Sequence, residues 1–368
     1  MLTCCCKTSS KTDKPASLIK GTVGFFFKGD TMLKRSILVL SSVLALLSAD
    51  VFSANSALTF LRISPSARAV AMGETFAAVA DGVDSVYWNP AGLANMETMD
   101  VSLMHMFYWD SSIYEYVAVS YPMSNKLKLG AHVIYMNYGA IEKIAETSSG
   151  SIGATSGTFT PYDLALAVSA GYQLSQDVQV GVTAKYAMQS IDTDSASAFA
   201  GDAGILARLK MFDDNLMFGG AISNLGTQIN GDSLPLTARG GLSYKMALME
   251  PEDLTIAVTA YYPFDTGKIA ENIGAEFWYQ KEIAIRAGYK LGYDVGNLTA
   301  GIGYKSALEG MFGYELDYTY APSGNLGDTH RISIILFLDE ATGGKRGSSS
   351  GSKNKGGIRT SPTPKKRF

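Results

Sequence analysis

The chain has 368 residues, and its 38 glycines, 20 tyrosines, 16 phenylalanines and 18% charged residues favour one large β-barrel over two soluble domains. The body from residue 55 to residue 340 has 16 Lys and Arg against 31 Asp and Glu, and this acidic balance argues against nucleic acid as a partner. All three cysteines lie at Cys4, Cys5 and Cys6, which excludes a disulfide framework or a cysteine zinc site from the body.

The start of the chain predicts a leader. Residues 32–54 begin with the basic pair Lys34-Arg35, continue with an apolar core from Ser36 to Ala49, and end in small residues. This order predicts a secretory signal peptide, because the apolar core is too short to cross a membrane as a helix. An uncleaved anchor is the alternative. Residues 1–31 are interpreted as an extension upstream of the true start.

Residues 55–98 differ from everything that follows them. They are rich in Ala and Gly, lack strand alternation, and end in Trp88-Asn89-Pro90-Ala91-Gly92-Leu93. Asp84 and Ser85 are placed to cap a short helical turn just before Trp88. We interpret this segment as a plug that packs inside the lumen of a barrel.

Residues 99–339 read as short alternating strands. In residues 178–183, for example, three valines share one face while Gln179, Gly181 and Thr183 share the other. Each run is about ten residues long, the length of a tilted transmembrane strand, and no later run reaches the roughly 18 apolar residues of a membrane helix. The pattern predicts an all-β fold, a transmembrane antiparallel β-barrel in a bacterial outer membrane, surrounded by outer-membrane lipid. A soluble β architecture is the alternative.

We count fourteen strands, an even number as a single-chain bacterial barrel requires. They lie near residues 100–109, 113–122, 126–137, 160–173, 177–190, 199–210, 214–223, 235–248, 252–262, 268–279, 282–291, 297–305, 309–320 and 326–338. Tight turns are predicted at 122–126 and 173–177, and longer loops at 138–160, 190–199, 224–235 and 321–326. Short turns at one end and long loops at the other are typical of outer-membrane barrels, and they place the plug and the C-terminus on the periplasmic side. Residues 340–368 predict a disordered basic tail.

The plug also resembles a known family. The stretch from Ser64 to Met96, SPSARAVAMGETFAAVADGVDSVYWNPAGLANM, resembles the N-terminal signature of PorV/PorQ-like outer-membrane proteins, which are relatives of the FadL-type transporters. Residues 221–226 and 234–241 match the same family further along the chain. The resemblance covers roughly residues 58–338. It implies that Trp88, Asn89 and Pro90 lie in the lumen near the periplasmic mouth. We interpret them as residues that lock the plug in place, and direct contact with a ligand is the alternative.

Two sets of inward residues are candidates for function. Arg62 and Arg68 precede the plug motif, and we expect inward Glu276, Glu315 and Asp317 to pair with them. A second set breaks the rule that lumen positions are polar, and it predicts an apolar patch on one inner wall. Its members are Met104, Met106, Ile134, Met136, Ile335 and Phe337. The patch is interpreted as a dry seat for plug residues such as Phe76, Val79 and Val86, or as a site for a hydrophobic ligand.

Catalytic and metal chemistry find little support. By strand parity His105 and His330 face lipid, while His132 points inward and is expected to be a packed lumen residue rather than a base. Asp192, Asp194 and Asp202 are explained by turn preferences without calcium. We therefore expect no enzyme activity, no cofactor and no metal.

Three functions remain within one fold. The resemblance favours a PorV-like role in type IX secretion, in which the barrel binds exported cargo proteins and passes them to attachment machinery. FadL-like passive uptake of hydrophobic small molecules is the alternative, with the apolar wall as the path and the plug as the gate. A structural envelope barrel is the third. Fold alone does not decide among them.

Overall fold

The computed structural model describes residues 56–146, 152–211, 215–229, 231–294, 296–308, 312–324 and 327–338. The predicted upstream extension 1–31, signal peptide 32–54 and basic tail 340–368 lie outside these residues. None of the helices formed by the described residues combines the length and hydrophobicity needed to cross a bilayer.

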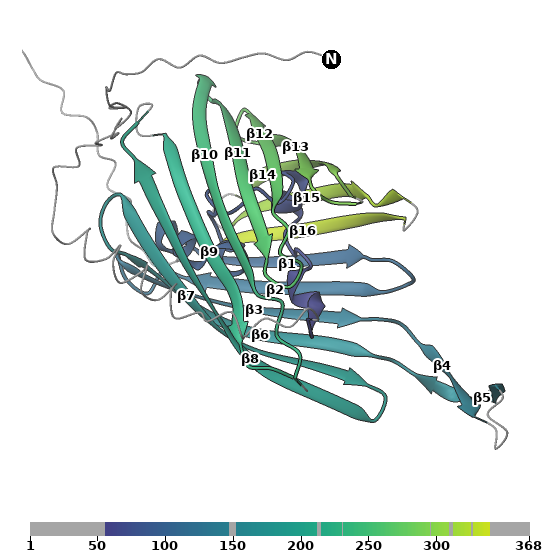
Figure 1. Ribbon diagram of the computed structural model, residues 1–368. Helices are drawn as coiled ribbons and strands as arrows, with labels where there is room; N and C mark the ends of the chain where they lie inside the picture. The colour runs from purple at the N-terminus through teal and green to yellow at the C-terminus, as the bar shows by residue number, and fades with distance from the viewer. Residues whose placement is uncertain are drawn as a thin grey trace, which may run out of the picture. The chain divides into compact units, whose positions relative to one another are not determined.

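Fourteen antiparallel strands close into one barrel, as the sequence predicts (Figure 1). The closing seam joins the first and last strands, with Met99 opposite Leu338 and Phe107 opposite His330. The strands are β1 (Met99–Phe107), β2 (Ile113–Tyr121), β3 (Leu127–Asn137), β6 (Tyr162–Gln173), β7 (Val178–Ile191), β8 (Asp194–Leu209), β9 (Leu216–Gly226), β10 (Thr237–Met249), β11 (Glu252–Pro263), β12 (Ala270–Tyr279), β13 (Ile283–Leu291), β14 (Leu298–Leu308), β15 (Phe312–Pro322) and β16 (Asp328–Leu338). Each overlaps one predicted strand, so the expected fold class and strand count are confirmed.

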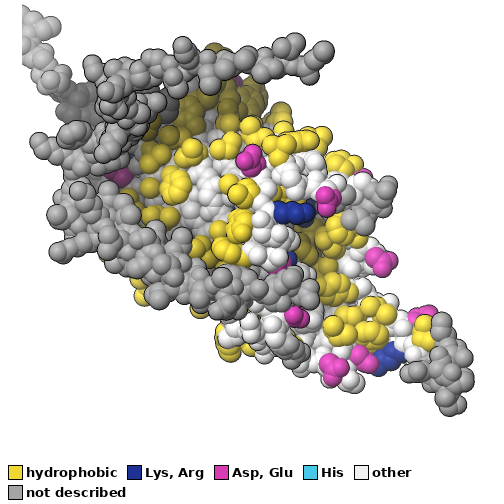
Figure 2. Space-filling model, viewed as in Figure 1, with side chains coloured by type: hydrophobic (Ala, Val, Ile, Leu, Met, Phe, Trp, Pro, Cys, Tyr) yellow, Lys and Arg dark blue, Asp and Glu magenta, His cyan; other side chains and the backbone are white. Residues whose placement is uncertain are grey.

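The barrel reverses the burial pattern of a soluble protein. Outward side chains are apolar and exposed, with Val168 at 63% and Ile285 at 57%, whereas inward Thr319 and Glu276 are at most 1% exposed. Figure 2 shows apolar side chains over much of the visible outer surface, and most of the visible charged ones lie toward the end that carries the β4–β5 hairpin. An apolar exterior around a closed sheet suits a wall in lipid, since closure leaves no unpaired edge. The fold therefore agrees with the predicted outer-membrane location.

Two predicted loops differ from the structure. The loop 138–160 contains a two-stranded hairpin, β4 (Ile141–Glu146) and β5 (Ile152–Phe159), which projects from the barrel (Figure 1). The predicted loop 190–199 is wrong, because β7 and β8 continue to a tight turn at Asp192-Thr193. Residues 192–197 are polar or small on both faces and so resemble a loop in sequence, but a strand that meets water on both faces needs no alternation.

Connections alternate in character along the chain. We call the end that carries the turns after β2, β6, β10 and β12 the short-turn end, and the opposite end, which carries the β4–β5 hairpin and the 227–236 loop, the long-loop end. The alternation follows the predicted pattern apart from the β7–β8 connection. Because each strand runs from one end of the barrel to the other, the depth of an inward side chain in the lumen follows from its position in its strand.

The plug fills the lumen with short helical pieces, η2 (Thr59–Arg62), α2 (Ala67–Ala71), α3 (Ser85–Trp88) and η3 (Pro90–Asn95). Ser66 caps α2 by accepting from the Ala69 N–H at 3.2 Å, and the Asn89 side chain caps η3 by accepting from Ala91 N–H at 3.2 Å. The expected cap by Asp84 is wrong. Asp84 occupies the N-cap position of α3 but makes no cap bond, and its carboxylate instead accepts a hydrogen bond from the Ser66 hydroxyl at 2.6 Å.

Candidate functional site

The plug crosses the lumen from one end to the other. At the long-loop end, Ser56 pairs with Ser233 and donates to Asp265 at 2.7 Å, and Arg62 donates to both oxygens of Asp265 at 3.0 and 2.6 Å. At the short-turn end, the segment runs directly into β1. The plug is therefore one continuous segment that spans the lumen and contacts both ends of the barrel.

Glycines on eight strands make room for the plug, and we call them the glycine seat. At each one a Cβ atom would come closer to a plug atom than side chains ever approach. The positions and distances are Gly130 (2.5 Å from Val86), Gly171 (2.7 Å from Leu93), Gly181 (2.2 Å from Pro90), Gly204 (2.0 Å from Asn89), Gly219 (2.0 Å from Ala77), Gly274 (2.1 Å from Met72), Gly288 (2.0 Å from Gly73) and Gly301 (2.6 Å from Ala71). At these positions the plug thus lies directly against the wall, with no space between them for a side chain.

The predicted plug motif lies at the centre of this packing. Trp88 is fully buried, with its ring 5.3 Å from Tyr87 and 6.1 Å from Phe76. The Asn89 amide donates to the carbonyl oxygens of Ala77 at 2.8 Å and Ile205 at 3.1 Å, so it links two parts of the plug to strand β8. These contacts join the plug to the wall, and direct contact of the motif with a ligand stays a prediction.

The predicted apolar patch forms one inner wall, on β1, β3 and β16. Five of its residues are buried, Phe337 is partly buried, and all six belong to or pack against one apolar cluster that includes the plug residues Phe76, Val86 and Leu93. His132 also points inward, as predicted, and its ring lies 5.8 Å from Tyr116 and 6.3 Å from Tyr87. In this structure the plug covers the patch.

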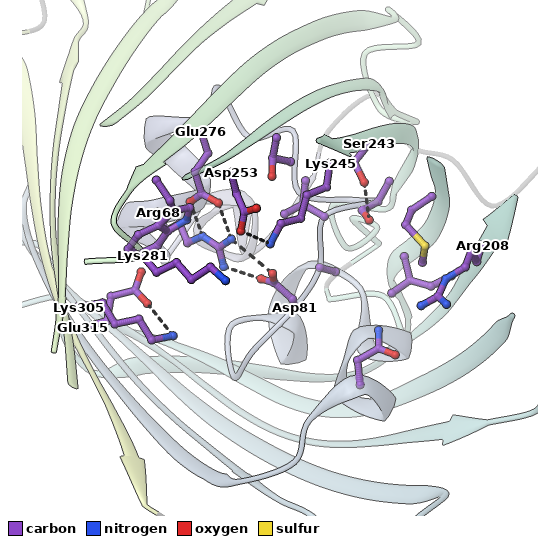
Figure 3. Close-up of a pocket in the computed structure, with 18 residues that line it drawn as sticks. Arg68, Asp81, Arg208, Ser243, Lys245, Asp253, Glu276, Lys281, Lys305 and Glu315 are labelled. Atoms are coloured by element: carbon purple, nitrogen blue, oxygen red, sulfur yellow. Dashed lines mark hydrogen bonds and ion pairs between the residues drawn. The ribbon is translucent and has the colours of Figure 1, made fainter. Parts of the chain in front are cut away.

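The adjoining part of the wall, on β12 to β15, is charged, and it borders the apolar patch where Glu315 of β15 pairs with Ile335 of β16. Arg68 of the plug donates to Glu276 at 2.7 and 2.8 Å and pairs with Asp81 (Figure 3). Behind it, the fully buried Arg286 donates to Glu276 at 2.6 Å, to Glu315 at 3.0 Å and to Asp317. Of the expected pairings, Arg68 with Glu276 is present. Arg62 pairs with Asp265 instead, and Glu315 and Asp317 are held by Arg286.

A cavity of about 510 Å³ opens beside this network, between the plug loop at residues 78–81 and the wall (Figure 3). Its lining mixes charged residues such as Arg68, Lys281 and Lys305 with apolar ones such as Met217. Lys281 lies in the turn after β12, so the cavity belongs to the short-turn end. It is a vestibule with a mixed polar and apolar lining.

The residues considered for chemistry are dispersed. Asp202 is buried and pairs with Lys185 at 2.7 Å, far from the exposed turn that holds Asp192. His105 pairs with Glu115 on the outer surface at 2.7 Å. Among the described residues, no group of three or more His, Cys, Asp or Glu side chains could hold a metal ion.

Comparison with known proteins places the chain in a family. Residues 49–336 match the family described as uncharacterised protein family UPF0164, and the chain belongs to it. No curated protein sequence matches the chain.

Solved structures resemble it at low identity. The toluene transporter TbuX of Ralstonia pickettii is 14% identical with a TM-score of 0.50, over 76% of this chain and 100% of that one. The toluene transporter TodX of Pseudomonas putida is 12% identical with a TM-score of 0.53, over 78% of this chain and 98% of that one. These likenesses show that the chain shares the fold of these two transporters. The finer resemblance to PorV and PorQ stays a prediction.

Proposed function

We propose that this protein carries small hydrophobic molecules across an outer membrane. The observation that supports this most directly is the apolar inner wall, where flexible Met104, Met106 and Met136 face the plug rather than water. Methionine side chains adapt their shape to different apolar partners. The fold is shared with two proteins named as toluene transporters. Uptake of hydrophobic compounds therefore agrees better with the molecule than secretion does.

The geometry suggests how passage would occur. The glycine seat holds residues 71–94 in place, so the plug does not leave the barrel as a unit. The stretch from Ser56 to Arg68 is held differently, through hydrogen bonds and ion pairs to Asp265 and Glu276. A hydrophobic guest would enter by replacing individual plug side chains on the apolar patch, because one apolar contact there is exchanged for another.

A reversible disulfide between the plug and the wall tests this proposal. The body has no cysteine, so Val86→Cys with Gly130→Cys forms a unique pair at a point where a Gly130 Cβ would lie 2.5 Å from the Val86 side chain. The assay is uptake of radiolabelled toluene by Gram-negative cells that lack their own transporter for it. Wild-type protein is expected to raise uptake, the oxidised double variant to abolish that gain, and a reductant to restore it.

The two single-cysteine variants serve as matched controls, because the transport of each should be the same under oxidising and reducing conditions. The proposal fails if wild-type protein, present and folded in the outer membrane, gives no more uptake than the empty host. It also fails if the locked pair transports as fast as the reduced one, because the plug–wall contact would then play no part.

The secretion role stays a prediction from the resemblance. It would use the external loops, and the loop from 138 to 160 does present the β4–β5 hairpin. Affinity purification from native outer membrane distinguishes the two roles. Recovery of a secretion translocon or of cargo domains would favour secretion, whereas recovery of apolar small molecules would favour uptake.

A further inference from the structure

The charged wall of the lumen holds more acid than base. Three buried carboxyl groups, on Glu276, Glu315 and Asp317, share a single fork, the guanidinium of Arg286. Arg68, whose side chain is 15% exposed, supplies the second cation through Glu276. At the edge of the cavity, Asp81 pairs with Arg68 and Lys305 lies 3.9 Å from Glu315; their side chains are 51% and 45% exposed, so water screens both of these opposite charges. Full ionisation would leave one uncompensated negative charge in the buried part.

Unpartnered polar atoms lie at the same place. Asp317 is 3% exposed, and its Oδ2 atom has no hydrogen-bond partner among the described residues. Directly opposite it on β16, Ser333 is 1% exposed and its hydroxyl is also without a partner there. A buried carboxylate oxygen without a donor is strongly disfavoured, whereas a protonated carboxyl group carries no charge and can itself donate.

We propose that Glu315 and Asp317 hold one proton between them, so that three carboxyl groups and two guanidinium groups form a neutral network that fastens the plug to the wall. Two acids at alternate positions of one strand, facing the same cation, cannot both ionise cheaply in a buried site. The proton belongs to the pair rather than to either residue.

The groups around the pair agree with this count. Those facing it are Arg68, Asp81 and Asp84 from the plug, Glu276 from β12, Arg286 from β13, and Lys305 from β14. Lys305 approaches Glu315 only to 3.9 Å, so it does not supply a close second cation. Burial also raises the pKa of Asp84, although its bond to Ser66 acts in the opposite direction. Gly303 leaves space for Asp317 and Arg286 to meet.

Infrared spectroscopy of the full chain, folded in detergent at neutral pH, tests this proton directly. A protonated carboxyl group gives a C=O stretch that an ionised one lacks. The wild-type spectrum minus that of Glu315→Gln is expected to show one lost carboxylic-acid band, because Asp317 can ionise once Glu315 is an amide. Asp317→Asn should lose the same band. Glu115→Gln, on the outer surface, should keep it.

The variants are also expected to unfold near the wild-type temperature, since an amide at either position reproduces the neutral partner. The proposal is overturned if the difference spectrum shows a lost carboxylate instead of a lost acid. It is equally overturned if both amide variants fail to fold, because that would show that all three negative charges are required. Neither result depends on what the barrel transports.

Discussion

Two adjoining regions of the lumen wall, the apolar side on β16 and β1 to β3 and the charged side on β12 to β15, hold the same plug by different physics. On the β1–β3 side, Met, Ile and Tyr side chains pack against Phe76, Val86 and Leu93. On the β12–β15 side, Arg68 and Arg286 bind three buried carboxyl groups. The apolar side tolerates exchange of one apolar group for another, because its contacts carry no direction. The charged side does not, because its two guanidinium groups and the carboxylates they bind must neutralise one another.

The difference suggests a division of labour. Ion pairs and the glycine seat fix the position of the plug, and the apolar side provides a surface that a guest can share. A plug held by apolar contacts alone would be free to slide, and one held by charges alone would offer a hydrophobic guest no favourable surface. Single substitutions can separate these contributions, and the largest effect is expected on the charged side.

Replacing Arg286 by Met should be the most damaging change on that side. It leaves Glu276, Glu315 and Asp317 buried without their shared cation, and removing one partner of a buried ion pair typically costs about 3–5 kcal/mol. The free energy of unfolding in urea, followed by tryptophan fluorescence, measures this cost. The control is Lys143→Met, which breaks an exposed pair with Asp192 and should cost at most about 1 kcal/mol. Equal costs for the two variants would contradict the distinction between buried and exposed pairs.

Truncating the apolar side should come next. Ile134 is 1% exposed within the apolar cluster, and Ile134→Ala should lower the free energy of unfolding by roughly 2–5 kcal/mol. The neighbouring Val133 is 38% exposed on the outer face, and Val133→Ala should cost clearly less because lipid replaces the lost contacts. If the two variants unfolded alike, the plug would not be packed on this wall.

A substitution in the glycine seat should have an intermediate effect, and it tests close packing of the plug rather than apolar or ionic contacts. In Gly181→Ala the new Cβ would lie 2.2 Å from the Pro90 backbone, and overpacking of this kind costs about 1–3 kcal/mol. Gly240→Ala is the matched control, since no atom lies within 4 Å of its Cβ position. Thermal unfolding of both variants measures the difference. A stable Gly181→Ala barrel with an unchanged melting temperature would show that the plug can move away from the wall.

The sequence predicts much of this arrangement in the strands, where contact with lipid constrains which side chains face outward. A strand in lipid must alternate, so strand parity alone places His132, Glu276 and the apolar patch inward. Parity also marks the inward glycines as signs of a crowded lumen. It does not say which plug residue each glycine meets, because the path of residues 56–98 has no repeating geometry.

Errors arise where the constraint of lipid ends. The partner of Arg62 is Asp265, which lies in the connection between β11 and β12, and no periodicity fixes the direction of a loop side chain. Residues 192–197 form strand instead of loop for the same reason, since strands that extend into water need no alternation. The sequence does not predict that Arg286 is the centre of the ion-pair network, because nothing in its own strand distinguishes it from other inward polar residues.

The smallest expected effect concerns the ion pair between Arg62 and Asp265 at the long-loop end, which we call the latch. Burial alone would raise the pKa of Asp265, but hydrogen bonds from Ser56 and Arg62 outweigh it and lower the pKa below its usual value. The stabilisation from an acid of this kind is present above its unfolded-state pKa of about 3.9 and is lost as the pH falls through the lower, folded-state value. For a partly exposed pair the loss should be at most about 1 kcal/mol.

The variant Asp265→Asn lacks this stabilisation at every pH. The difference in unfolding free energy between wild type and variant should therefore narrow as the pH is lowered from neutral to about 3. Because all other acids titrate in both proteins, only this gap reports on the latch. A gap that stays constant over the whole range would mean that Asp265 does not hold the start of the plug.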